Sequence, residues 1–162
     1  MLKVYLKKGD KSLSHEYLFE ILSREFGLNY SEADLKKTPY GKYYIDGADI
    51  KFNVSHSKDN IVIAISDSEV GVDCEVVKDE YRVRRIFGVI PKTAELYAEL
   101  WTKAESIVKY NASSILADLK KIDLSKKPTV DGVEIDFNLF TFHHDGLIVT
   151  VATKENGYSI GD

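Results

Sequence analysis

The sequence contains little cysteine and no long apolar run. Its single cysteine, Cys74, excludes an internal disulfide framework and favours a reducing compartment. The apolar run within residues 1–12 is too short for a signal peptide, and no segment approaches the roughly 18 apolar residues that cross a bilayer. We therefore expect a cytoplasmic protein that does not enter a membrane.

Basic residues are also too few for broad nucleic-acid binding. The chain has 22 Lys and Arg residues against 26 Asp and Glu residues, for a formal net charge of −4 at pH 7. Nucleic-acid-binding domains normally carry a basic excess, so we expect no nucleic-acid partner, although a local basic pocket for a small anion is compatible with this charge. Hydrophobic residues at 44% and charged residues at 30% are typical of a globular chain.

The first part of the chain is predicted to form a helix and then a β-hairpin. Apolar side chains at helical spacing predict a helix over 12–26, capped by Ser12 or Ser14 and ended by Gly27. Two β-rich runs around a polar turn then predict a hairpin over 49–66.

The second part repeats this order. A strand over 70–77 precedes strong helix formers over 94–109, and a hairpin over 138–154 turns at the Asp-Gly pair of residues 145–146. The polar stretch 119–127 is expected to be a loop. The repetition predicts an α+β fold by pseudo-twofold duplication, in which each half packs a long helix on a small antiparallel sheet.

The predicted halves are residues 1–66, with the GKYY and FNVSHS segments, and residues 67–162, with the GVDCE and WTKAESIVK segments. Because one chain supplies both halves, we expect a monomer.

The GVDCE segment at 71–75 carries two acids on one side of a strand. Asp73 and Glu75 point the same way because side chains alternate along a strand, whereas Cys74 faces the core. Neighbouring carboxylates raise each other's proton affinity, and a hard cation such as magnesium relieves that repulsion. The alternative is a strand end with two solvated acids, which is favoured for an isolated pair.

Two further segments contain groups suited to phosphate chemistry. Trp101, Glu105 and Lys109 are four apart and line one helical face, although a core Trp beside a surface ion pair is the alternative. In the FNVSHS segment, Ser55 and His56 lie at the end of a strand, where they can hold phosphate oxygens. The alternatives there are a turn whose Ser and Asn side chains bond the backbone, or a partly buried structural histidine.

In combination, these segments resemble the 4'-phosphopantetheinyl transferase superfamily in its Sfp-like, surfactin-synthetase-activating type. FNVSHS precedes GVDCE, WTKAESIVK follows about 30 residues later, and GKYY at 41–44 resembles the GKP element of the family. The resemblance implies transfer of 4'-phosphopantetheine from coenzyme A to a serine of an apo-acyl or peptidyl carrier protein, with release of 3',5'-ADP. It does not indicate which carrier or pathway.

The resemblance also implies roles for individual residues. Magnesium is expected at Asp73, Glu75 and Glu105, where it would neutralise charge on the leaving group. Asp73 and Glu105 are the catalytic candidates, with Glu105 as the base for the carrier serine. Replacement of Asp73 is expected to remove a ligand and no packing. The expected coenzyme A contacts are Ser55, His56 and Lys109 to phosphates and Lys42 to the nucleotide part.

Departures from the family pattern keep other hypotheses open. Ala104 stands where the family usually has Lys, Tyr43 replaces Pro, and the short N-terminal half lacks a Lys/Arg-rich segment for the 3'-phosphate, for which Lys7, Lys8 or Lys11 are candidates. The main alternative is a non-catalytic member of the same fold that binds coenzyme A or a carrier. A metal-dependent phosphohydrolase and a plain α+β interaction module are the remaining alternatives.

Overall fold

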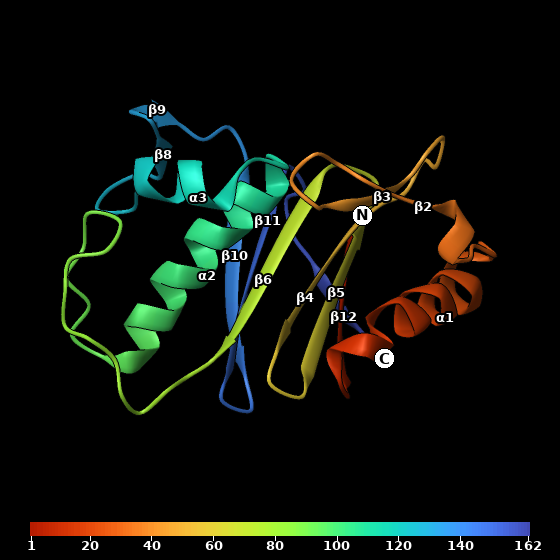
Figure 1. Cartoon of the computed structure of the whole chain (residues 1–162), viewed down its shortest axis with the longest axis horizontal. Coiled ribbons are helices and arrows are strands. Elements are labelled where there is room, and N and C mark those ends of the chain that lie inside the picture. The colour runs from red at the N-terminus through yellow and green to blue at the C-terminus, as the bar shows by residue number, and fades with distance from the viewer.

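Two β-sheets lie at the centre of the molecule, and one long helix covers the outer face of each (Figure 1). The computed structural model describes residues 1–162. Its layers are, in order, helix α1, the larger sheet, the smaller sheet and helix α2.

The helices and strands have the following bounds along the chain: β1 Leu2–Lys8, η1 Lys11–Leu13, α1 Ser14–Phe26, η2 Glu32–Asp34, β2 Leu35–Lys37, β3 Tyr43–Ile45, β4 Lys51–Ser57, β5 Asn60–Ser66, β6 Val70–Val76, α2 Ala94–Tyr110, α3 Ile115–Asp118, η3 Leu119–Lys121, β7 Ile122–Asp123, β8 Thr129–Val130, β9 Val133–Glu134, β10 Asn138–His144, β11 Leu147–Thr153 and β12 Ser159–Gly161.

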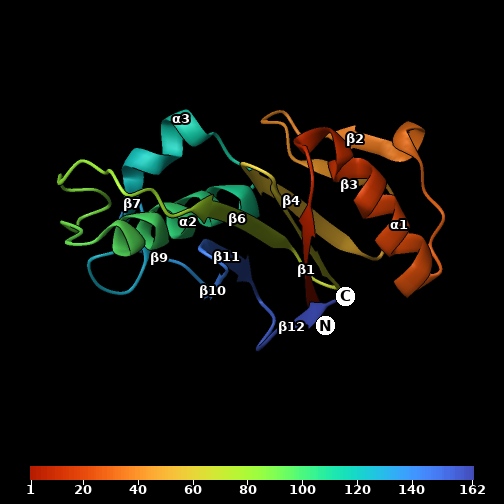
Figure 2. The ribbon, with the colours of Figure 1, turned by 90° about the horizontal axis from the view of Figure 1, so that it is seen from below.

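The larger sheet has the strand order β12-β1-β5-β4, and the smaller one has the order β10-β11-β6. Neighbouring strands pair antiparallel, except that β12 runs parallel to β1 (Figure 2). Two small sheets, β2-β3 and β7-β8-β9, complete the fold. The strands β4 and β6 are therefore edge strands of different sheets.

The facing sides of the two sheets share one apolar core, built from alternate residues of β1, β5, β6 and β11. Its buried members are Leu2, Val4, Val62, Ala64, Val70, Val72, Cys74, Leu147, Val149 and Val151. The opposite face of the larger sheet packs against α1 in a second core. Because β5 and β11 are buried on both faces, their sequences are apolar runs rather than strict alternations.

Helix α2 packs closely on β6 because Gly71 has no side chain. A Cβ atom at Gly71 would overlap the backbone of Ser106 and Tyr110 in α2. The first residue of the GVDCE segment therefore sets how near α2 comes to the strand that carries the two acids.

The predicted helices and hairpins are confirmed. Gly27 ends α1 in the left-handed conformation, with φ of 67°. Asp145 and Gly146 both have positive φ, 47° and 75°, as the predicted tight turn between β10 and β11 requires.

Two local predictions were wrong. Neither Ser12 nor Ser14 caps the start of the first helix. The side chain of Asp10 accepts a hydrogen bond from the Ser12 amide instead, because the chain enters α1 through the short helix η1. The expected loop over 119–127 contains η3 and β7, and Ile122 in β7 is buried against α2.

The α+β class is confirmed, with small sheets and few helices. Strand, helix and hairpin follow in the same order in β1-α1-β4-β5 and in β6-α2-β10-β11. β12 comes from the second predicted half but pairs with β1 of the first (Figure 2). None of the helices combines the length and the hydropathy needed to cross a membrane.

Candidate active site at the border of the two sheets

The three motifs meet where β4 and β6 lie side by side (Figure 1). β4 carries FNVSHS, β6 carries GVDCE, and α2, which covers β6, carries WTKAESIVK. Each motif comes from a different element, so the site depends on how the two sheets meet.

Asp73 lies at the centre of this arrangement. Its Oδ1 accepts hydrogen bonds from Lys109 Nζ at 2.6 Å and from Ser55 Oγ at 3.0 Å, and Lys109 Nζ also lies 3.2 Å from Ser55 Oγ. The Asp73 side chain is only 7% exposed. Burial raises the pKa of the Asp73 carboxyl, while the Lys109 ammonium and the Ser55 hydroxyl act in the opposite direction.

Glu105 and Glu75 belong to the same electrostatic cluster. Burial raises the pKa of the Glu105 carboxyl, the negative charge of Asp73 raises it further, and Lys109 opposes both. Glu75 also contributes to this rise, although its own side chain lies 3.4 Å from Lys78 Nζ in a partly exposed ion pair. The charges of Asp73 and Glu75 therefore both act on Glu105.

A cleft of about 540 Å³ lies on the β4 side of these acids. Its walls come from the start of α1, the loop at 40–43, β4 and the end of α2, so it lies between the two predicted halves. No acidic residue lines it, although the chain as a whole has an acidic excess. Its basic residues are Lys11, His15, Lys42, His56 and Lys109. This is the local basic pocket that the composition allows.

Lys42 lines the cleft, but its ammonium group is already paired. Lys42 Nζ donates to the Glu69 carboxylate and, at 2.7 Å, to the carbonyl oxygen of Val70 at the start of β6. The side chain is 9% exposed, and burial lowers the pKa of Lys42. The amine therefore holds the 40–43 loop against β6.

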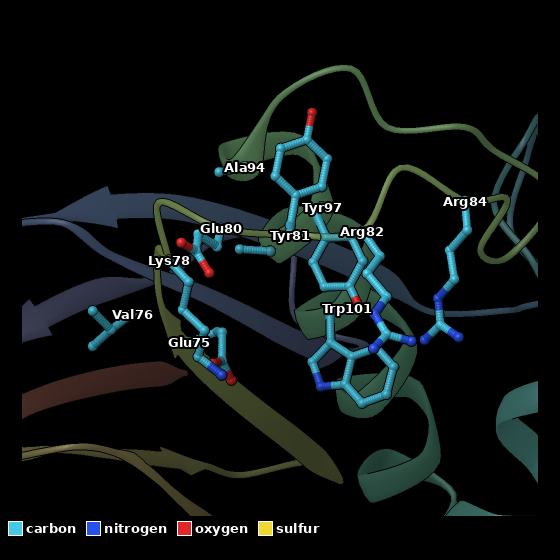
Figure 3. A pocket seen from close by; sticks show the side chains of 11 residues that line it. Glu75, Val76, Lys78, Glu80, Tyr81, Arg82, Arg84, Ala94, Tyr97 and Trp101 are labelled. Atoms are coloured by element: carbon cyan, nitrogen blue, oxygen red, sulfur yellow. The ribbon is translucent and has the colours of Figure 1, made fainter.

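A second hollow, of about 570 Å³, has Glu75 in its lining (Figure 3). Tyr97 and Trp101 of α2 contribute to one wall, and the segment between β6 and α2 contributes Tyr81 and Arg82. Glu75 thus borders this second pocket, and Lys109, which pairs with Asp73, borders the basic cleft.

Comparison with known proteins identifies two relatives. A 4'-phosphopantetheinyl transferase, gsp, of Aneurinibacillus migulanus is 26% identical over 129 residues, which cover 72% of this chain and 52% of the relative. The 4'-phosphopantetheinyl transferase AcpT of Salmonella typhimurium is 35% identical over 83 residues, which cover 42% of this chain and 43% of the relative.

This chain is similar to 4'-phosphopantetheinyl transferases. The resemblance predicted from the motifs is confirmed, and the names of both relatives support that enzyme class. No family model matches the chain. The chain spans about half the length of the two relatives it matches.

One departure from the transferase pattern has a structural explanation. Ala104, where these enzymes usually have Lys, is fully buried in a core with Ile107 and Val108. A Lys at this position would bury its ammonium group at a high cost. Lys103, the preceding residue, lines a separate hollow with Leu124 and is not positioned to replace a Lys at 104.

The acids match magnesium in chemistry, but they do not form a complete cation site as they stand. No group of three or more His, Cys, Asp or Glu side chains is close enough to hold a metal ion. Lys109 lies against Asp73 instead. Carboxylates are the ligands that magnesium prefers, so the residue types fit. A cation bound through Asp73 Oδ1 would require Lys109 to move away from that oxygen.

The expectation that Asp73 contributes no packing was wrong. Its carboxylate is buried and paired with Lys109 and Ser55. Asp73→Ala would leave the Lys109 ammonium, itself 22% exposed, without its partner, which costs stability as well as a ligand. Asp73→Asn, which keeps the shape, is the more specific change.

Sequence reasoning missed the contacts that join β4 to β6. Asn53 Oδ1 accepts from the Val72 amide at 2.8 Å, and Ser57 Oγ accepts from the Val76 amide at 3.0 Å. The signal was the alternation of polar side chains in FNVSHS. Cys74 is buried in the core between the sheets, as predicted, and burial raises its pKa to about 12.

Proposed function

We propose that this protein transfers 4'-phosphopantetheine from coenzyme A to a serine of an apo-carrier protein, in a magnesium-dependent reaction that releases 3',5'-ADP. The observation that carries the proposal is the position of Asp73, Glu105 and Lys109 beside a basic cleft without acidic lining. Similarity to two proteins named as such transferases supports the same activity.

The phosphates of coenzyme A fit the basic cleft. His56 and Lys109 line it and offer donors for phosphate oxygens, and Ser55 lies beside Lys109 at its inner end. Lys11 and His15, at the entry to α1, line the same cleft and are our candidates for contact with the 3'-phosphate. Lys42 lines the cleft near the nucleotide part, with its amine directed to Glu69.

The pantetheine arm fits the pocket at Glu75. The arm is attached at the β-phosphorus, so it begins where the acids lie. It consists of methylene and amide groups, which suit the aromatic side chains Tyr81, Tyr97 and Trp101 of this pocket. Charged side chains, namely Lys78, Glu80, Arg82 and Arg84, also line it. The two hollows would then hold the two ends of one substrate, with the reacting phosphorus between them.

Asp73, Glu75 and Glu105 are the residues that would hold magnesium. The ion supplies neutralisation of the charge that develops on the departing 3',5'-ADP. Lys109 can then turn from Asp73 to a phosphate oxygen, since its flexible side chain lies in the wall of the cleft.

Glu105 is the proposed base. The oxygen of the carrier serine forms a bond to the β-phosphorus, the bond from that phosphorus to the bridging oxygen breaks, and 3',5'-ADP leaves with the electron pair. The serine proton passes to a carboxylate oxygen of Glu105. A carboxylate that holds magnesium through one oxygen keeps a second oxygen, and that oxygen of Glu105 would accept the proton.

The shared order of β1-α1-β4-β5 and β6-α2-β10-β11 supports a pseudo-twofold duplication, with halves at 1–66 and 67–162. We infer a monomer, because one chain supplies both sides of the cleft, and a cytoplasmic location, because a single cysteine suits a reducing compartment. Light scattering that gives a stable trimer would contradict the monomer.

Intact-mass spectrometry tests the activity. The protein is incubated with a panel of apo-carriers, coenzyme A and magnesium, and we expect one carrier to gain the mass of one phosphopantetheine. Asp73→Asn should abolish the gain, and EDTA should do the same. No gain on fatty-acid, polyketide or peptide-synthetase carriers would contradict the transferase activity.

The second candidate is a non-catalytic protein that binds coenzyme A. The observation in its favour is the ion pair of Lys109 with Asp73, which occupies a predicted metal ligand. Calorimetric binding of coenzyme A without mass gain on any carrier would support it.

A further inference from the structure

Strand β6, which carries Asp73 and Glu75, has one edge that forms no backbone ladder with a neighbouring strand. β6 is the last strand of its sheet, and its one ladder partner is β11. In an antiparallel pair, successive residues direct their amides alternately toward and away from the partner strand. The Val77 amide donates to Gly146 on the β11 side, so the amides of residues 72, 74 and 76 point to the open edge.

A side chain of β4 accepts a hydrogen bond from each of these three amides. Asn53 Oδ1 accepts from Val72 at 2.8 Å. Ser55 Oγ accepts from Cys74 at 3.3 Å. Ser57 Oγ completes the series at the amide of Val76, at 3.0 Å.

The residues that form these three hydrogen bonds are regularly spaced in the sequence. Each accepting residue precedes its donor by 19 positions, and both members advance by two residues from one bond to the next. β4 and β6 therefore run in the same direction in a fixed register, joined by side chains instead of backbone carbonyls. We call the set Asn53, Ser55 and Ser57 the β4 zipper.

Lys42 extends the same edge by one step. Its Nζ donates to the carbonyl oxygen of Val70, the residue two positions before Val72. The outward amides of residues 72, 74 and 76 and the carbonyl of Val70 thus all have side-chain partners.

The β4 zipper can fix the positions of Asp73 and Glu75 relative to β4. Asp73 and Glu75 lie between the amides that the zipper holds, and they leave the strand on the face toward α2. Ser55, in the middle of the zipper, also donates directly to Asp73 Oδ1. A change of register between β4 and β6 would carry both carboxylates away from His56 and Ser55.

We propose that Asn53 and Ser57 are positioning residues, which hold β6 in register with β4 so that Asp73 and Glu75 stay beside the phosphate-binding residues of β4. The role in the site rests on the proposed function. The hydrogen bonds of the β4 zipper to the edge of β6 do not rest on it, because the backbone amides they involve contact neither substrate nor metal.

Ser57 allows an isosteric test. Ser57→Thr keeps the hydroxyl, Ser57→Val replaces it with a methyl group of the same shape, and the side chain is only partly buried, which leaves room for both. Hydrogen exchange by NMR, without coenzyme A or metal, should show the Val76 amide exchanging about fivefold to tenfold faster in the Val variant, as expected for one lost hydrogen bond. The Thr variant should match the natural protein.

The second readout is metal affinity. Binding of Mn²⁺, followed by electron paramagnetic resonance, should weaken about tenfold in Ser57→Val and recover in Ser57→Thr, which is the scale on which partners of metal ligands act. Asn53→Leu is the second variant, with the faster exchange expected at Val72. Denaturation curves of each variant are the control that it is folded.

Thr141→Val is the matched control. It also exchanges a hydroxyl for a methyl group, but Thr141 bonds Thr150 on β11, outside the zipper. We expect lower stability with unchanged Mn²⁺ affinity and unchanged exchange at Val76.

The outcomes separate the inference from the proposed function. Equal exchange at Val76 in the Thr and Val variants of Ser57 overturns the zipper. Faster exchange with unchanged Mn²⁺ affinity overturns the positioning role. Absence of transferase activity in the natural protein overturns the proposed function and leaves the exchange test in force.

Discussion

Single side chains in this protein often serve two groups at once. Ser55 Oγ accepts a hydrogen bond from the Cys74 amide and donates one to Asp73. Lys42 forms an ion pair with Glu69 and donates a hydrogen bond to the Val70 carbonyl oxygen. The motif resemblance predicts Ser55 and Lys42 as ligand contacts. Their bonds to β6 depend on the meeting of two distant strands, which no local pattern contains.

Of the predicted first-half contacts Lys42, Ser55 and His56, His56 is the one whose side chain is not bonded to another part of the protein. It is exposed and lines the basic cleft. His56→Ala should weaken coenzyme A binding by on the order of 1.5–3 kcal/mol, the worth of a hydrogen bond to a charged group. Calorimetric titration with coenzyme A measures this.

His143→Ala is the control for His56. His143 is also exposed, but it bonds Glu99 in the first half of α2, whereas the cleft is lined by the end of α2 and not by His143. Equal loss of affinity in both variants, or no loss in His56→Ala, would remove His56 from the site.

Tyr5 has a buried hydroxyl without a hydrogen-bond partner. Tyr5→Phe should therefore stabilise the protein by on the order of 1 kcal/mol at neutral pH, because an unpaired buried polar group is costly. Urea denaturation measures the free energy of unfolding. A destabilised Phe variant would indicate that the hydroxyl has a favourable partner.

The same residue predicts a pH dependence. Burial raises the pKa of Tyr5 from 10.0 to about 12. Between these values the unfolded chain loses the phenolic proton before the folded one, so stability falls as pH rises through this window. The fall should be smaller in Tyr5→Phe. Parallel curves for the two proteins would contradict the shift.

At the scale of elements, close packing decides how near α2 comes to β6. Gly71→Ala places a methyl group against the backbone of Ser106 and Tyr110. We expect a loss of about 1–3 kcal/mol or more in the free energy of unfolding, because backbone cannot yield as a side chain can. Chemical denaturation is the measurement.

Gly157→Ala is the matched control for Gly71→Ala. A Cβ at Gly157 meets no atom within 4 Å, so this variant should be close to neutral. A Gly71→Ala variant as stable as Gly157→Ala would mean that α2 and β6 separate without cost.

The sequence predicts the elements well for physical reasons. The hairpins β4-β5 and β10-β11 have apolar runs interrupted by turn residues, and α2 has apolar side chains at helical spacing. Such signals are local. The pairing of β12 with β1 and the register of β4 with β6 join residues that are distant in sequence, so periodicity could not reveal them.

For the candidate site, the motifs identify the acids and Lys109 because the chemistry requires those residue types at that spacing. They do not reveal that Lys109 pairs with Asp73, or that Ala104 occupies a buried position. Both facts depend on how α2 rotates against β6, which is set by Gly71 and by the core around Ile107.

At the scale of the whole molecule, the cleft joins two layers that otherwise meet along the β4 zipper and the core between the sheets. His56 comes from the larger sheet, and Lys109 comes from the helix that covers the smaller one. A ligand held by both is expected to stabilise the folded chain as one unit rather than one half alone.

Thermal unfolding with coenzyme A and magnesium tests this expectation. At a ligand concentration of about 100 times Kd, mass action adds about 2.7 kcal/mol, which corresponds to a rise of roughly 5–10 °C in Tm for a chain of this size. Because β4 and α2 both contribute to the cleft, the unfolding curve should keep a single transition that moves as a whole. His56→Ala and Lys109→Met should each reduce the rise, whereas His143→Ala should leave it unchanged. Two transitions, of which coenzyme A moves only one, would show that the ligand binds a single half, and the cleft between the halves would then not be its site.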